Sequence, residues 1–127
     1  MKLKILLRLI GAIQIVLGLG YLFAPQALLH SMGHSTSATD LNYPLGMLAA
    51  RFLVYGIVLI IISRAAFEHR LWISSMVFIQ LIDFSVGVFY TAAGIVPLSL
   101  SGFPMFNALW ISVLLWVWRP VSLEKQK

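Results

Sequence analysis

The sequence contains no cysteine and few charged residues. Without cysteine, the chain has no disulfide, thiolate nucleophile, iron–sulfur cluster or thiolate zinc site. Only 10% of its 127 residues are charged, whereas 61% are hydrophobic. Soluble domains carry roughly a quarter charged residues and are about half apolar. The composition therefore indicates a membrane protein, with no room for a separate soluble domain.

Four apolar segments are long enough, or nearly so, to cross a bilayer. We expect an all-α fold, an antiparallel four-helix bundle forming one membrane-spanning domain over residues 1–127. The expected spans are about 5–23, 45–63, 71–93 and 103–118. The last would be about 24 Å long, short of a ~30 Å hydrocarbon core. The apolar loop 94–102 is therefore expected to dip into the membrane.

The basic residues are distributed unevenly, within a net charge of +5. Eight of the nine fall on one side of the expected spans: Lys2, Lys4, Arg8, Arg64, Arg70, Arg119, Lys125 and Lys127. By the positive-inside rule both termini are cytoplasmic. Because topology accounts for the charge, no nucleic-acid partner is expected. The first span lacks a plausible cleavage site and is expected to remain uncleaved. The expected location is a cell membrane, a bacterial inner membrane.

The ninth basic residue, Arg51, lies inside the second span, and Asp83 lies inside the third. A charge at such a position costs about 2.5–3.5 kcal/mol on insertion scales, which makes it a functional-site hypothesis with a partner to be named. Arg51 is thirteen residues from Arg64, and Asp83 is thirteen from Arg70. Both therefore lie about 20 Å from the cytoplasmic ends of their helices. We predict that the two charges pair.

Further polar residues fall at or near the same depth. Tyr21 is thirteen residues from Arg8, and Asn107 is twelve from Arg119. Gln80 precedes Asp83 by three residues and so shares its helix face. The candidate ligand-binding residues are therefore Arg51, Asp83, Asn107, Tyr21, Gln80 and Tyr55.

This predicted polar layer has two interpretations. Arg presents five fixed donors that match a carboxylate or another planar anion. If Asp83 occupies only some of them, the rest can bind a small lipid-like or quinone-like molecule under the outer loops. Alternatively, the ion pair is purely structural, and the chain is an accessory subunit of a homo-oligomer or larger membrane complex. Proton-coupled transport is a third option, which the small number of ionisable groups disfavours.

Other candidate sites have less support in the sequence. His30, Met32 and His34 in the first outer loop combine imidazole and thioether groups, which suit Cu(I). The spacing equally fits ordinary interfacial residues, so no metal site is assigned. No nucleophilic triad is present, so the sequence leaves open whether the chain is an enzyme, and it names no cofactor.

Several short motifs resemble those of the DoxX-like small four-helix membrane proteins. They are the first-span end Tyr21-Leu22-Phe23-Ala24-Pro25, then Gly33, then Ala49-Ala50-Arg51-Phe52 through Gly56, and Gly87. The resemblance covers nearly the whole chain and implies the same four-helix fold. Some members of that group are tied to quinone-linked sulfur oxidation. No catalytic motif for that reaction is identifiable here, so the resemblance implies the fold and not the reaction.

Overall fold

The computed structural model describes residues 1–35 and 38–120, and these residues form helices and connecting turns without any strand. The basic residues Lys125 and Lys127, used in the topology prediction, lie outside this range. In chain order the helices are α1 (Lys2–Phe23), α2 (Pro25–Ser31), the 3-10 helix η1 (Thr39–Leu41), α3 (Asn42–Ile62), α4 (Arg70–Ala92) and α5 (Leu98–Trp118).

Four of these helices, α1, α3, α4 and α5, are long and apolar enough to cross a membrane. This agrees with the composition and indicates a multi-pass membrane protein. The first three begin and end within three residues of the predicted spans. The all-α class is confirmed for the described residues.

The fourth span differs from its prediction because α5 begins at Leu98, five residues before the expected start. Gly102 and Pro104 are poor helix formers, yet both lie inside the helix. The backbone N–H groups of Leu100 and Ser101 bond the Pro97 carbonyl and so form the first turn. With 21 residues, α5 is about 31 Å long and matches a ~30 Å core. Residues 98–102, predicted to be part of a loop, therefore belong to α5, and the helix itself supplies the missing length.

The chain divides into two compact units. Residues 8–61 form the first, here called the α1–α3 unit, which also contains α2 and η1. Residues 1–7 and 62–127 form the second, the α4–α5 unit.

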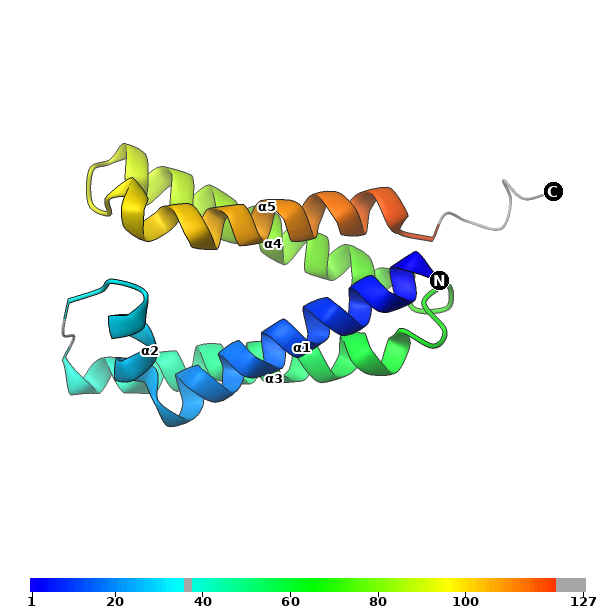
Figure 1. Cartoon of the computed structure of the whole chain (residues 1–127), viewed down its shortest axis with the longest axis horizontal. Coiled ribbons are helices and arrows are strands. Elements are labelled where there is room, and N and C mark those ends of the chain that lie inside the picture. The colour runs from blue at the N-terminus through cyan, green and yellow to red at the C-terminus, as the bar shows by residue number, and fades with distance from the viewer. Residues whose placement is uncertain (36–37, 121–127) are drawn as a thin grey trace. The chain divides into compact units, whose positions relative to one another are not determined.

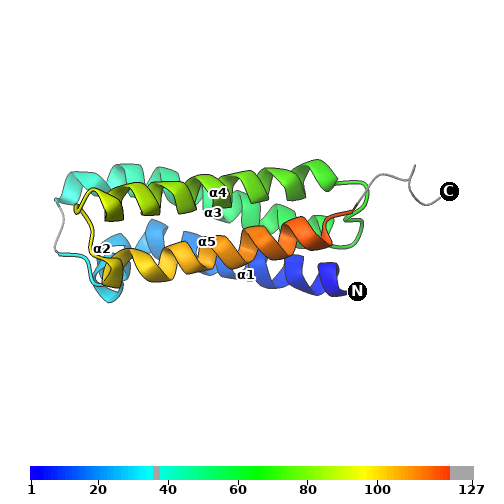
Figure 2. The same cartoon turned by 90° about the horizontal axis from the view of Figure 1, so that it is seen from above.

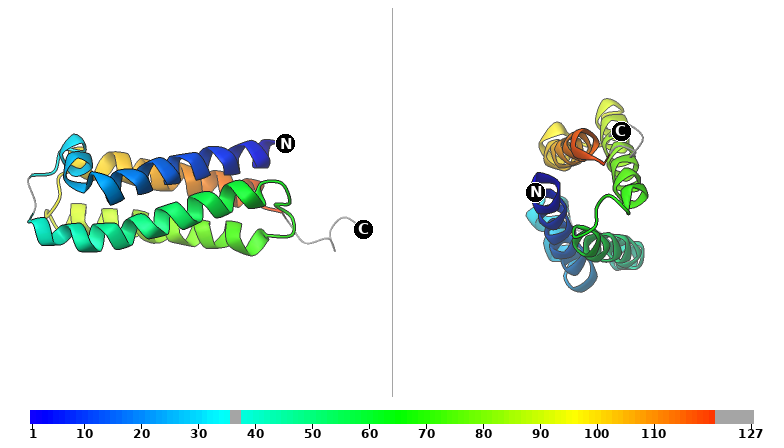
Figure 3. Two further views of the ribbon diagram at one scale, coloured as in Figure 1. Left: turned by 90° about the horizontal axis from the view of Figure 1, so that it is seen from below. Right: turned by 90° about the vertical axis from the view of Figure 1, so that its right-hand side faces the viewer.

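Small residues bring α1 and α3 into close antiparallel contact (Figures 1 and 3). A Cβ added to Gly11 would lie 2.7 Å from the carbonyl oxygen of Gly56, and one added to Gly56 would lie 2.7 Å from that of Gly11. Two turns further along α1, a Cβ on Gly18 would meet the Leu53 side chain at 2.8 Å. Glycines at helix contacts let two backbones approach closely in a membrane, where apolar burial gives no advantage over lipid.

Helix α2 folds back at the end of α1. Pro25 occupies its first turn, where a missing N–H costs nothing. Gly33, with φ of +91°, ends it in a Schellman motif, since His34 N–H bonds the Leu29 carbonyl and Gly33 N–H that of His30. The Gln26 amide then donates to Asn42 Oδ1 at 2.7 Å, which fastens α2 to the beginning of α3.

Helices α4 and α5 form an antiparallel hairpin (Figure 2). Gly94, with φ of +72°, ends α4 in a second Schellman motif, in which Ile95 N–H bonds the Tyr90 carbonyl. Just inside the turn, the Thr91 and Ser101 hydroxyl oxygens lie 2.6 Å apart. One turn deeper, Gly87 makes room for Met105, whose sulfur would lie 2.7 Å from a Cβ at that position.

Candidate functional site

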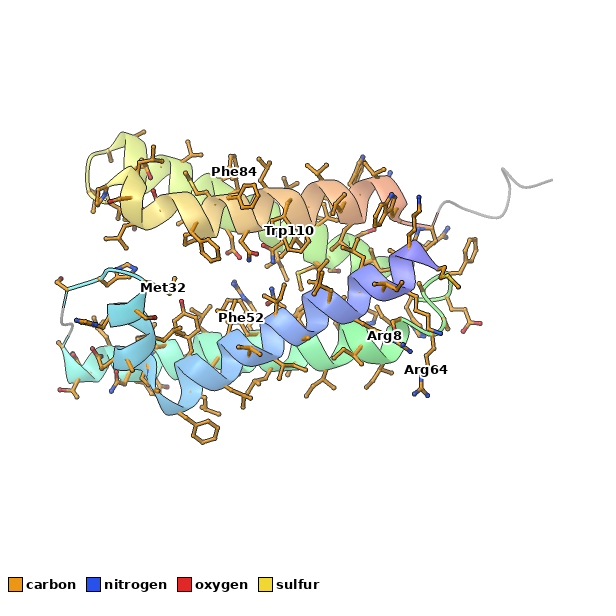
Figure 4. The ribbon with its side chains drawn as sticks, in the orientation of Figure 1. Arg8, Met32, Phe52, Arg64, Phe84 and Trp110 are labelled. Atoms are coloured by element: carbon orange, nitrogen blue, oxygen red, sulfur yellow. The ribbon has the colours of Figure 1, made fainter. Side chains whose placement is uncertain are left out.

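In the α1–α3 unit, the polar residues Tyr21 and Arg51 both contact the ring of Phe52. Phe52 was not among the candidate site residues predicted from the sequence. The Tyr21 and Phe52 rings stack, with centroids 5.6 Å apart and planes within 5° of parallel. The Arg51 guanidinium carbon lies 5.2 Å from the centroid of the same Phe52 ring. That distance is within the range of a cation–π contact. The Phe52 ring therefore contacts both the Tyr21 phenol of α1 and the Arg51 guanidinium of α3. Phe52 is labelled in Figure 4.

Two candidate residues, Tyr21 and Arg51, are thus brought to one place. Both side chains are half-buried, as is Phe52. A half-buried cation, a phenol hydroxyl and an aromatic face together suit a planar ligand that carries carbonyl or anionic oxygens.

The Tyr21 hydroxyl meets the thioether of Met32, with 3.9 Å between oxygen and sulfur. A thioether is a weak acceptor, and the contact is long, so a ligand oxygen could replace it at little cost. Met32 is the C-cap of α2, and through it α2 covers the Tyr21 end of the cluster. Sequence analysis considered Met32 only as a metal ligand.

The third candidate residue of this unit, Tyr55, lies one turn beyond Arg51 on α3 and is half-buried. Its i, i+4 spacing from Arg51 places both on neighbouring parts of the α3 surface.

The remaining candidates belong to the α4–α5 unit. Gln80 is only 3% exposed, and its amide donates to the Met76 sulfur one turn earlier on α4 at 3.3 Å. Asp83 is half-buried one turn further along. On α5, Asn107 accepts a hydrogen bond from the Trp110 indole N–H at 3.1 Å. Gln80 and Asn107 are therefore each held by a neighbour on their own helix. The pairing of Arg51 with Asp83 remains a prediction from residue counts.

The suggested copper ligands have other roles in the structure. Met32 contacts Tyr21, and the backbones of His30 and His34 form the Schellman turn. Among the described residues no group of three or more His, Asp or Glu side chains could hold a metal ion. The proposed copper ligands His30, Met32 and His34 include a thioether and so do not form such a group. Copper binding by these three residues remains a prediction from the sequence.

Comparison of the chain with protein-family models, with curated proteins and with solved structures finds no match.

Proposed function

We propose that the chain is a small multi-pass membrane protein that binds a lipid-like or quinone-like molecule at Arg51. In this proposal the four long helices form an antiparallel bundle in a bacterial inner membrane with both termini in the cytoplasm, as in the DoxX-like proteins that the sequence resembles. The ligand lies toward the outer face, between the polar groups of the helices.

The observation that supports this proposal is the contact of both Arg51 and Tyr21 with the same aromatic ring, that of Phe52. A purely structural cation in a membrane helix needs a counter-charge but no aromatic platform. Phe52 supplies a flat apolar wall, Arg51 supplies fixed donors, and Tyr21 supplies a hydroxyl with a weak acceptor beside it. Those three features recognise the ring and the carbonyl oxygens of a quinone, or the head group of a lipid.

The test is mass spectrometry of small molecules that co-purify with the detergent-extracted chain. We expect wild type to carry one specific lipid-like or quinone-like species at near-stoichiometric amounts. Arg51→Lys should lose most of it, because Lys keeps the charge but lacks the planar fork of donors. Arg64→Lys makes the same chemical change at an exposed turn and should retain the ligand. Wild type without any specific molecule would end the proposal.

A second function, that of an accessory subunit in a larger membrane complex, is supported by the surface of α3. A Cβ on Gly46 would meet nothing within 4 Å, and Ala50, one turn further, is exposed. Small residues on an open helix face suit contact with a partner helix. If this function holds, the chain should migrate with a complex in native gels, and Gly46→Leu with Ala50→Leu should release it.

A further inference from the structure

A separate apolar groove runs between α4 and α5 in the α4–α5 unit. Its volume is about 380 Å³, within the ~300–1,000 Å³ range of small-molecule sites. The lining is almost entirely apolar, with Val77, Phe78 and Leu81 from α4 and Leu109, Ser112, Val113, Trp116 and Val117 from α5. None of the candidate residues discussed above lines it.

A cation lies at one end of this groove. Trp116, which lines the groove, has the Arg119 guanidinium carbon 3.3 Å from a ring centroid. Arg119 directly follows the end of α5, and Pro120 after it prevents the helix from continuing. Because the hairpin is antiparallel, Arg70 at the beginning of α4 lies at the same end (Figure 2). The groove is thus lined by apolar side chains, and one of them, Trp116, carries the stacked Arg119 cation.

The groove and the cation beyond it together match one leaflet of a bilayer. The α5 lining runs from Leu109 to Val117, eight residues or about 12 Å, and Arg119 lies two residues further on, about 15 Å from Leu109 along α5. Half of a ~30 Å hydrocarbon core is also about 15 Å. An acyl chain in the groove would therefore place its head group beside Arg119 and its methyl end near the bilayer centre.

We propose that this groove binds an anionic phospholipid, with one acyl chain along α4 and α5 and the phosphate at Arg119. Arg is suited to phosphate because its planar fork donates two parallel hydrogen bonds. Stacking on Trp116 holds the guanidinium at the groove while leaving its edge donors for the phosphate oxygens. The proposal rests on the membrane placement proposed above, but not on the ligand at Arg51.

The experiment is a lipid titration of the full chain in detergent, followed by native mass spectrometry. Phosphatidylglycerol and phosphatidylcholine with identical acyl chains are the two probes. We expect one phosphatidylglycerol per chain, bound about fivefold more tightly than phosphatidylcholine, as one interfacial Arg contributes. Arg119→Gln should abolish this preference. Arg64→Gln removes the same charge from the turn before α4, outside the groove, and should keep it.

A groove-filling variant provides the second measurement. Val113 is 49% exposed in the groove wall, so Val113→Trp can be accommodated without disturbing the core and should weaken binding of both lipids. Arg51→Lys should bind phosphatidylglycerol like wild type, which separates this site from the one at Arg51. Equal affinity for the two lipids in wild type, or equal effects of Arg119→Gln and Arg64→Gln, would overturn the proposal. So would a Val113→Trp variant that changes the oligomeric state but not lipid binding, since the groove would then be an interface between copies.

Discussion

Gly11 of α1 and Gly56 of α3 face each other so closely that a Cβ on either would lie 2.7 Å from the carbonyl oxygen of the other. The obstacle is backbone in both directions, which cannot rotate away as a side chain can. The α1–α3 unit therefore depends on the absence of two side chains, and the Phe52 cluster is built on the same pair of helices.

This contact predicts different outcomes for two glycine substitutions in one helix. Gly56→Ala should lower the stability of the detergent-solubilised protein by about 1–3 kcal/mol, the usual cost of overpacking. Gly46→Ala is the matched control, because nothing lies within 4 Å of its Cβ, and alanine is a better helix former than glycine. Thermal unfolding followed by circular dichroism measures both. Equal losses for the two variants would contradict the close contact.

A second prediction concerns the aromatic platform. Phe52→Leu removes both the Tyr21 stack and the Arg51 cation–π contact and should cost about 1–2 kcal/mol in thermal stability. Phe23→Leu is the control, because Phe23 ends α1 with 78% of its surface exposed. Tyr21→Phe should keep the stability but reduce the amount of co-purified ligand, since only the hydroxyl is lost. Identical stabilities of the Phe52 and Phe23 variants would show that the stack contributes nothing.

The hydroxyl pair at the turn of the α4–α5 hairpin gives a third prediction. Thr91 can donate to the Gly87 carbonyl at 2.7 Å, Ser101 can donate to the Pro97 carbonyl at 3.3 Å, and the two oxygens are 2.6 Å apart. Each hydroxyl has only one hydrogen, so one of the carbonyl bonds gives way to the bond between the hydroxyls. A double-mutant cycle with Thr91→Val and Ser101→Ala should give a coupling of about 0.6 kcal/mol, the average for membrane helices. Additive effects of the two changes would indicate that the hydroxyls act only within their own helices.

The sequence predicted the long helices well because apolar length is a strong signal that needs no tertiary information. The beginning of α5 was misplaced because local propensity at Gly102 and Pro104 was outweighed by the turn formed at Pro97. Residue counts predicted a common depth for Arg51 and Tyr21, and both residues contact the Phe52 ring in the structure. The ring that joins them, Phe52, was named only as part of a motif, and nothing in its spacing distinguishes it from Phe23 as a site residue.

Helix α2 illustrates the same limit. The run from Pro25 to Ser31 is too short to register as a helix by periodicity. It is fixed by the local glycine turn at Gly33 and by the Gln26–Asn42 hydrogen bond, whose partners are 16 residues apart in the sequence. The Met32 contact with Tyr21 follows from that fold-back and was not predictable without it.

The absence of cysteine makes the topology directly testable. Ser35→Cys and Glu68→Cys each introduce a single thiol at an exposed position. If both termini are cytoplasmic, the first should react with a membrane-impermeant maleimide added to intact spheroplasts. The second should react only after the membrane is permeabilised. Wild type, which has no thiol, is the control, and the opposite pattern would invert the proposed orientation.

The last prediction separates a structural ion pair from a ligand-binding one, on the hypothesis that Arg51 pairs with Asp83. Removing one partner of a buried pair costs about 3–5 kcal/mol whatever its purpose, so single variants cannot distinguish the two cases. The swap Arg51→Asp with Asp83→Arg keeps both charges and should recover thermal stability relative to either single variant. If the pair also binds ligand, the donors then project from another helix, away from the Phe52 ring, and the co-purified molecule should stay lost. Recovery of both stability and the bound molecule would show that the position of the guanidinium is irrelevant to binding. Failure to recover stability would instead refute the pairing itself.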